Sequence, residues 1–299
     1  MKLNSTILAT GIGSLLMFPL AAPAPADVKA AARVVHERSN ASIVGIKGLL
    51  KIDVTMNGQP AGNQETAVWG NGTVIGERLA VTAYSSLVPD VAAQGPGGAL
   101  PPGVEIKTKL NEVKFVDGSG EEYEAKLILH DEDLDLAFLA IDPKADNADA
   151  WEIGAVDISS DPEVDLLDEV VSLSRHSSTL RFASALKTGT INAVVKRPRT
   201  MYAIDGISHG APTFTSDGAF LGMVVLRKST EKKQPPVPIV LPAKYVKKLV
   251  PQAVEKQKEL ASAEGGESAE EEGESTPAPE GADGGTEENE DPSAAAGEE

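Results

Sequence analysis

The stretch "NEVKFVDGSGEEYEAKLILHD", residues 111–131, decides the fold class. Apolar and polar side chains alternate on both sides of Asp117-Gly118, and this dipeptide between two alternating runs is typical of a β-hairpin turn. Asp217-Gly218 separates a second such pair of runs. Similar short runs recur along the chain: 41–56, 65–76, 78–84, 134–142, 169–175, 186–195, 201–205 and 213–227. The pattern predicts an all-β fold of sandwich or barrel type.

Two helices and several loops frame these predicted strands. We expect a short helix over "DVKAAARVVHER" (27–38) and a closing helix over "PAKYVKKLVPQAVEKQKELA" (242–261), in which Pro251 either introduces a kink or begins a second helix. The Pro- and Gly-rich stretches 88–103 and 232–238 are predicted to be surface loops. A spacer at 143–163 divides the strands into two groups, which favours two barrels.

The two ends of the chain differ in composition from its middle. Residues 1–26 combine Lys2, an apolar stretch and Ala24-Pro25-Ala26 before Asp27, the pattern of a signal peptide cleaved near Ala26. We therefore expect a periplasmic or secreted protein without a stable membrane anchor after cleavage. Because the chain has no cysteine, disulfides cannot stabilise it.

The formal net charge of −18 is concentrated at the C-terminus. Residues 264–299 hold 14 of the 45 acidic side chains and no basic one, so the rest of the chain is nearly balanced. The segment 263–299 contains few apolar residues besides Ala, and we expect it to be a disordered acidic tail that solvates the protein. Its charge argues against nucleic acid as a partner.

Several segments, taken in order, resemble the trypsin-like serine proteases of the bacterial HtrA/Deg branch. They are "GNGTVIGERLAVTAYSSLV" (70–88), "VKFVDGSGEEYEAKLILHDEDLDLAFLAI" (113–141), "LLDEVVSL" (166–173), "KTGTINAV" (187–194), "APTFTSDGAFLGMVV" (211–225) and "IVLPAKYVKKLV" (239–250). The resemblance implies a trypsin-like double β-barrel over residues 27–262. Barrel one would span about 42–145, barrel two about 160–242 and the C-terminal helix about 243–262.

The positions that match the family's catalytic triad do not carry its residues. Three positions after Thr82, where the resemblance implies the histidine base, this sequence has Ser85, whereas Asp135 retains the aspartate. Counting back from Pro212 places His209 at the nucleophile's position, and counting forward from Gly206 places Ser208 there. The first register is preferred because the hairpin that follows is the better anchor.

The loop that would stabilise the oxyanion also departs from the pattern. In the preferred register Ile207 replaces its glycine, and Gly210 follows. Glycine matters there because the loop must turn its backbone N–H groups toward the developing negative charge. The triad is therefore predicted to be degenerate, and the protein to be a pseudoprotease that binds a peptide or protein in its cleft.

Alternative interpretations remain open at this stage. An active serine endopeptidase would need an unusual base, and a scaffold protein would have a filled cleft. The exchange of serine and histidine between positions 85 and 209 could in principle form a working triad, but Ser85 would then lie between Asp135 and His209, away from the oxyanion donors. "GISHG" (206–210) also matches the elbow of α/β-hydrolases, but no histidine follows it.

Nothing in the sequence predicts a cofactor or a metal. His36, His130 and His176 are expected to be solvent or packing residues, and no histidine pair has metal-ligand spacing. The oligomeric state is left open.

Overall fold

The computed structural model describes residues 27–91, 100–228 and 236–266. The predicted signal peptide (1–26) and residues 267–299 of the predicted acidic tail lie outside the described residues, as do 92–99 and 229–235 within the two predicted loops.

The first half of the chain forms a closed six-stranded antiparallel barrel, with strand order β1-β2-β3-β6-β5-β4. Its strands are β1 (Ile43–Met56), β2 (Gln59–Gly76), β3 (Leu79–Ala83), β4 (Val104–Val116), β5 (Glu122–Asp131) and β6 (Leu136–Ile141). The predicted turn at Asp117 joins β4 to β5, and its carboxylate accepts the backbone N–H groups of Ser119, Gly120 and Glu121 at 2.8–2.9 Å. These bonds give the three N–H groups partners at the turn, where the hydrogen bonds between the two strands end.

The second half forms another closed six-stranded barrel, in the order β10-β11-β12-β9-β8-β7. Its strands are β7 (Glu169–Arg175), β8 (Ser184–Val195), β9 (Met201–Ile204), β10 (Pro212–Thr215), β11 (Phe220–Arg227) and β12 (Val237–Pro242). The predicted turn at Asp217-Gly218 joins β10 to β11. The all-β, trypsin-like double barrel that the sequence predicts is thus confirmed.

Apolar burial explains why the two barrels stay together. One buried cluster fills each barrel, and a third cluster lies between them, with Phe138 of β6, Phe214 of β10 and Val35 of the first helix among its members. Arg175 at the end of β7 adds polar links, because its guanidinium donates to the carbonyl oxygens of Ile43, Phe182 and Asn40 at 2.7–2.9 Å.

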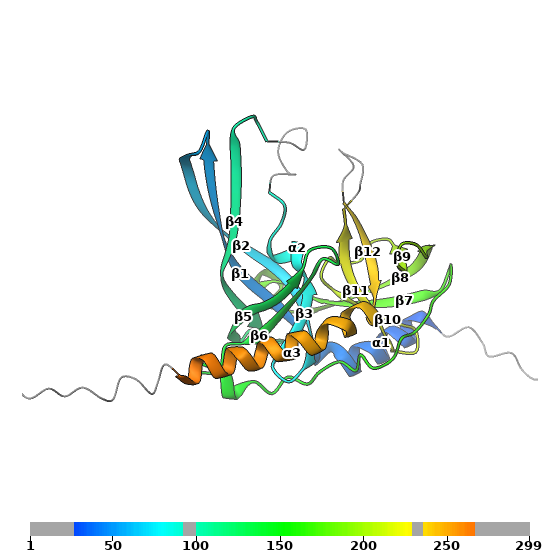
Figure 1. Cartoon of the computed structure of the whole chain (residues 1–299). Helices are drawn as coiled ribbons and strands as arrows, with labels where there is room; N and C mark the ends of the chain where they lie inside the picture. The colour runs from blue at the N-terminus through cyan, green and yellow to red at the C-terminus, as the bar shows by residue number, and fades with distance from the viewer. Residues whose placement is uncertain (1–26, 92–99, 229–235, 267–299) are drawn as a thin grey trace, which may run out of the picture.

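Helices cover one side of the paired barrels, as Figure 1 shows. The helix α1 (Val28–Ser39) is preceded by the N-cap residue Asp27, whose side chain accepts the backbone N–H of Lys29 at 3.0 Å. The helix α3 (Ala243–Gly266) contacts β5 and β6 of barrel one and β11 and β12 of barrel two. It runs through Pro251 as one helix, so the predicted alternative of a second helix is wrong, and it ends four residues beyond the predicted 262.

The strands β1, β2 and β4 continue beyond the closed part of barrel one as a projecting arm (Figure 1). In this arm β1 is central, because Val54 pairs with Gly62 of β2 and with Ile106 of β4. The arm rises on the same side of the molecule as the ends of β11 and β12 (Figure 1).

Candidate functional site

The position of Ser85 is fixed by a buried strand and a single helical turn. All five residues of β3 are buried between β2 and β6, and the chain then turns into α2 (Tyr84–Leu87). Thr82 Oγ1 donates to the carbonyl oxygen of Asn71 at 2.6 Å, and Ser86 Oγ donates to that of Ala83 at 2.6 Å. These bonds hold the turn, from which the Ser85 side chain reaches Asp135 of barrel one and His209 of barrel two.

Asp135 is held in the adjacent turn between β5 and β6. Its backbone adopts a positive φ of 56°, and only 7% of the residue is exposed. Its carboxylate accepts the backbone N–H of Ser85 and the Ser85 hydroxyl, each at 2.7 Å. It also accepts the backbone N–H of Leu226 in β11 at 2.7 Å, so this carboxylate bridges the two barrels.

His209 completes the site from barrel two, in the turn that precedes β10. Its Nε2 lies 2.9 Å from Ser85 Oγ and 3.5 Å from Asp135 Oδ2. The turn is fastened to β11, since Gly210 N–H donates to the carbonyl oxygen of Val224 at 2.9 Å. Ser208 contributes its carbonyl oxygen, which accepts Ala211 N–H at 3.2 Å. The structure therefore brings the side chains of Ser85, Asp135 and His209 together.

The loop at 206–210 has positive φ angles on either side of position 207, but not at Ile207 itself. Gly206 and Gly210 have positive φ values of 74° and 75°, whereas Ile207 is not among the residues with positive φ. The Ile207 side chain packs against the core of barrel two. The N–H of Gly210 is already bonded to Val224, so this group is not directed at the Ser85–His209 pair.

The environment keeps Asp135 ionised. Burial favours its neutral form, but hydrogen bonds from the His209 side chain, the Leu226 N–H and Ser85 outweigh burial and lower the pKa of the carboxyl. The Ser85 proton therefore faces a stable carboxylate, which is a weak base.

The other histidines lie apart from this cluster. His36 Nε2 lies 2.8 Å from Ser184 Oγ, and the ring of His130 stacks on Tyr84 with centroids 4.5 Å apart. His176 donates its backbone N–H to Ala183. Within the described residues no group of side chains has the make-up of a metal site, and no helix there is long and apolar enough to cross a membrane.

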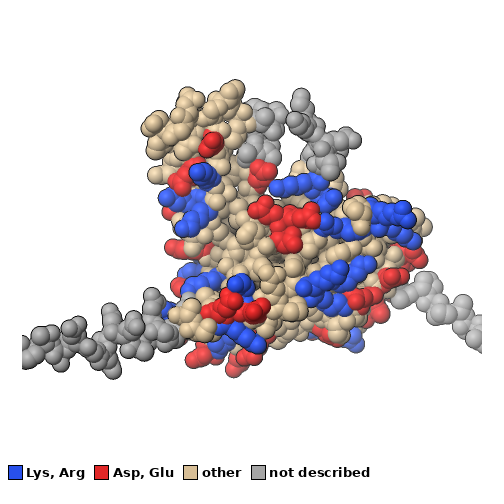
Figure 2. All heavy atoms as spheres, viewed as in Figure 1, with Lys and Arg blue, Asp and Glu red and all other residues tan. Residues whose placement is uncertain are grey.

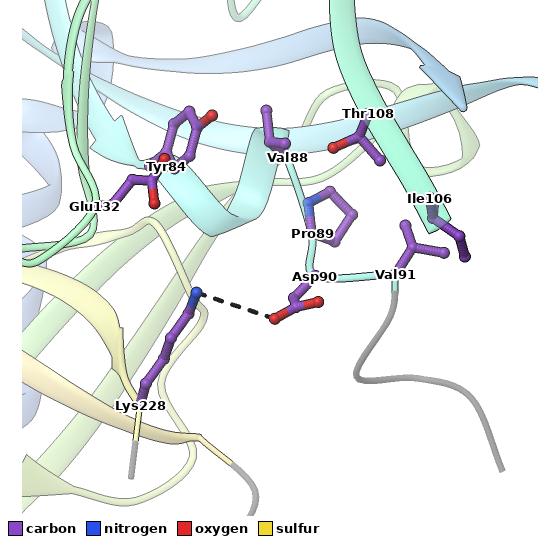
Figure 3. A pocket seen from close by; sticks show the side chains of 9 residues that line it. All are labelled: Tyr84, Val88, Pro89, Asp90, Val91, Ile106, Thr108, Glu132 and Lys228. Atoms are coloured by element: carbon purple, nitrogen blue, oxygen red, sulfur yellow. Dashed lines mark ion pairs between the residues drawn. The ribbon is translucent and has the colours of Figure 1, made fainter. Parts of the chain in front are cut away.

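Two features of the site could not be read from sequence. One is the Leu226 N–H, because a backbone donor carries no residue signal. The other is a cavity beside Tyr84 that gathers residues from four segments (Figure 3).

Comparison with known families agrees with this geometry. The model of the trypsin-like peptidase domain matches residues 70–223, which include Ser85, Asp135 and His209. The chain belongs to the trypsin-like peptidase family. Among curated proteins no significant match is found.

Proposed function

We propose that this protein is a pseudoprotease of the HtrA-like branch, which binds extended peptide without cleaving it. The observation that carries the proposal is the residue at the position of the catalytic base, where the hydroxyl of Ser85 lies 2.7 Å from the carboxylate of Asp135. Peptide hydrolysis by this family's mechanism requires a base at that position which removes a proton from the nucleophile. A serine hydroxyl has no such basicity.

One observation favours a second candidate, an active enzyme with exchanged roles. Ser85 Oγ lies 2.9 Å from His209 Nε2, within the range of a nucleophile–base pair. However, Asp135 competes with His209 for the single hydroxyl proton of Ser85, and the loop that would carry oxyanion donors carries the histidine itself. Both facts argue against an activated nucleophile.

Peptide binding is supported by the course of β11. This strand pairs with β12 as far as Arg227, but with β10 only as far as Met223. Beyond Met223, the backbone groups of β11 that face away from β12 bond to a loop and to a side chain instead of a strand. The Val224 carbonyl oxygen accepts the N–H of Gly210 and the Val224 N–H donates to Ala211, whereas the Leu226 N–H donates to Asp135. In an extended chain the backbone groups of successive residues point to alternate sides, so those of Lys228 face the same side as those of Leu226. A peptide could add there as a further strand.

Export belongs to the same proposal. The apolar segment within 1–26 and the absence of cysteine support a periplasmic or secreted location, with a peptide or protein as partner. Fractionation of the source cells, with antibody to the domain, tests this part separately.

A fluorophosphonate probe tests the absence of activity, because it labels only an activated serine. We expect no labelling of the full chain and no cleavage of unfolded protein above background. Labelling that disappears in Ser85→Ala, but persists in Ser208→Ala, would overturn the proposal in favour of the exchanged pair. Labelling lost only in Ser208→Ala would overturn it in favour of Ser208.

Peptide binding is tested at the strand edge. Fluorescence anisotropy with a labelled pool of acetylated nonapeptides should detect binding, which Lys228→Pro should weaken because proline removes the N–H on the groove side. Lys228→Ala, which keeps that N–H, is the matched control. Absence of binding of any pool to the unmodified chain would overturn the binding function.

A further inference from the structure

A cavity of about 310 Å³ lies between the projecting arm, the turn after β3 and the end of β11 (Figure 3). It has none of the three site residues in its wall, although Tyr84 in the wall directly precedes Ser85. Most of its exposed lining is polar, and Val88, Pro89, Val91 and Ile106 add apolar side chains to it. The cavity thus adjoins the site but is a separate feature.

The arm presents its uncharged face to this cavity. Ile106 and Thr108 of β4 line the cavity, whereas Glu105 and Lys107 alternate with them along the strand and are exposed. Successive side chains of a strand point to opposite faces, so Glu105 lies on the face away from the cavity.

Among the described residues that line the cavity, the charged side chains have a negative balance. Asp90 and Glu132 face one cation, Lys228, whose Nζ lies 4.0 Å from Asp90 Oδ2 (Figure 3). Glu132 has 70% of its side chain exposed, and its ion-pair partner is His130 at 3.9 Å, a cation only when protonated. Figure 2 shows acidic side chains gathered on this face between the two barrels.

We infer that this cavity receives the side chain of a lysine or arginine from the bound peptide, an inference that rests on the proposed function. Lys228 lies two residues beyond Leu226, so a peptide paired along this edge passes the cavity. A long basic side chain has an aliphatic stem that packs on apolar groups and a charged end that stays in water. The apolar side chains of the lining and the carboxylate of Glu132 match these two parts.

Two matched peptide pools test this inference on the full chain. Both are acetylated, amidated nonapeptides of uncharged residues, with the central residue fixed as arginine in one and as its neutral analogue citrulline in the other. We expect the arginine pool to bind about three- to fivefold more tightly, the effect of one partly exposed ion pair. Glu132→Gln should abolish this preference, and Lys228→Met, which removes the competing cation, should increase it.

Glu105→Gln is the matched control, because it removes the same charge from the opposite face of β4. Glu105→Gln should retain the preference for arginine. This result would also distinguish recognition in the cavity from a general attraction of basic peptides to an acidic chain. Equal binding of both pools, or equal loss in Glu105→Gln and Glu132→Gln, would overturn the inference but leave the proposed function standing. A pool with central glutamate that binds more tightly than both would also overturn it.

If no pool binds, the proposed function fails and the cavity is judged alone. Nα-acetyl-arginine amide is then titrated into the isotope-labelled full chain and followed by NMR. Shifts at Tyr84, Val88 and Ile106 that are absent with the citrulline amide would support the cavity as a basic-side-chain site, and their absence would overturn it.

Discussion

Ser85 Oγ of barrel one and His209 Nε2 of barrel two lie 2.9 Å apart, beside the carboxylate of Asp135. Asp135 accepts two hydrogen bonds from Ser85 and one from Leu226, so the cluster satisfies a buried carboxylate and joins the barrels. This is the arrangement of a stabilising network, and its energetics can be measured.

Asp135→Asn should change how stability depends on pH. The pKa of Asp135 is lowered in the folded protein, so its stabilising effect is fully present above the pKa of the unfolded state, about 3.9. The effect is lost as the pH falls through the lower folded pKa. Urea unfolding from pH 7 to pH 2.5 should show a larger acid loss of unfolding free energy for the unmodified protein than for Asp135→Asn.

Other carboxylates with lowered pKa values contribute to acid unfolding in both proteins, so the difference between the two curves is the relevant quantity. Asp117 is one of them, because hydrogen bonds from Ser119 and neighbouring backbone N–H groups outweigh its burial. Superimposable pH profiles for the two proteins would show that the network around Asp135 does not stabilise the fold.

Arg175→Met should destabilise the protein by about 2 to 4 kcal/mol, because it leaves buried carbonyl oxygens without their donor. The guanidinium donates to Ile43, Phe182 and Asn40, and only 5% of Arg175 is exposed. Urea unfolding measures the change. The exposed Arg33, changed to Met, is the control and should shift the unfolding free energy by less than about 0.5 kcal/mol. Equal changes in unfolding free energy for the two variants would show that the hydrogen bonds of Arg175 do not stabilise the contact between the barrels.

Deleting residues 267–299, which follow α3, should leave the melting temperature nearly unchanged. The segment has few apolar residues beyond Ala, so it has little surface to bury against the barrels. Differential scanning calorimetry measures the effect. A fall of more than about 4 °C, roughly 1 kcal/mol or somewhat more for a domain of this size, would show that the segment docks on the fold.

The fold was predictable because its signal is local and repeated. The alternation around Asp117 and Asp217 specifies hairpins, and short antiparallel connections leave few ways to arrange them. The sequence left open whether Pro251 lies within one helix or begins a second, and in the structure α3, which packs on both barrels, continues through it.

The site was predictable only in part, since it depends on register. The sequence allowed either His209 or Ser208 at the nucleophile's position; in the structure the His209 side chain lies beside Ser85, and the N–H of the neighbouring Gly210 bonds to Val224. Neither that bond nor the Leu226 N–H at Asp135 has a side-chain signature. The cavity wall likewise joins residues as distant as Asp90 and Lys228, which become neighbours only in the fold.

Restoring the family's residues tests how far the site has departed from catalysis. Ser85→His with His209→Ser would rebuild a triad beside Asp135, but we expect no proteolysis from this double variant. Ile207 keeps its packed conformation without a positive φ, so the loop does not turn its N–H groups toward the oxyanion. One missing oxyanion donor costs about 10²- to 10³-fold in rate. Adding Ile207→Gly should then give weak activity, measured by fluorophosphonate labelling at position 209 and by release of a fluorogenic peptide product.

The triple variant needs its own control, because Ile207 contributes apolar packing to barrel two. Ile207→Gly alone should destabilise the protein by about 1 to 3 kcal/mol, and circular dichroism must show that the triple variant is folded. Activity already present in the double variant would show that Ile207 does not block the oxyanion loop. A folded triple variant without activity would leave two explanations: a substrate cleft that has itself closed, or a register in which Ser208 rather than His209 holds the nucleophile's position.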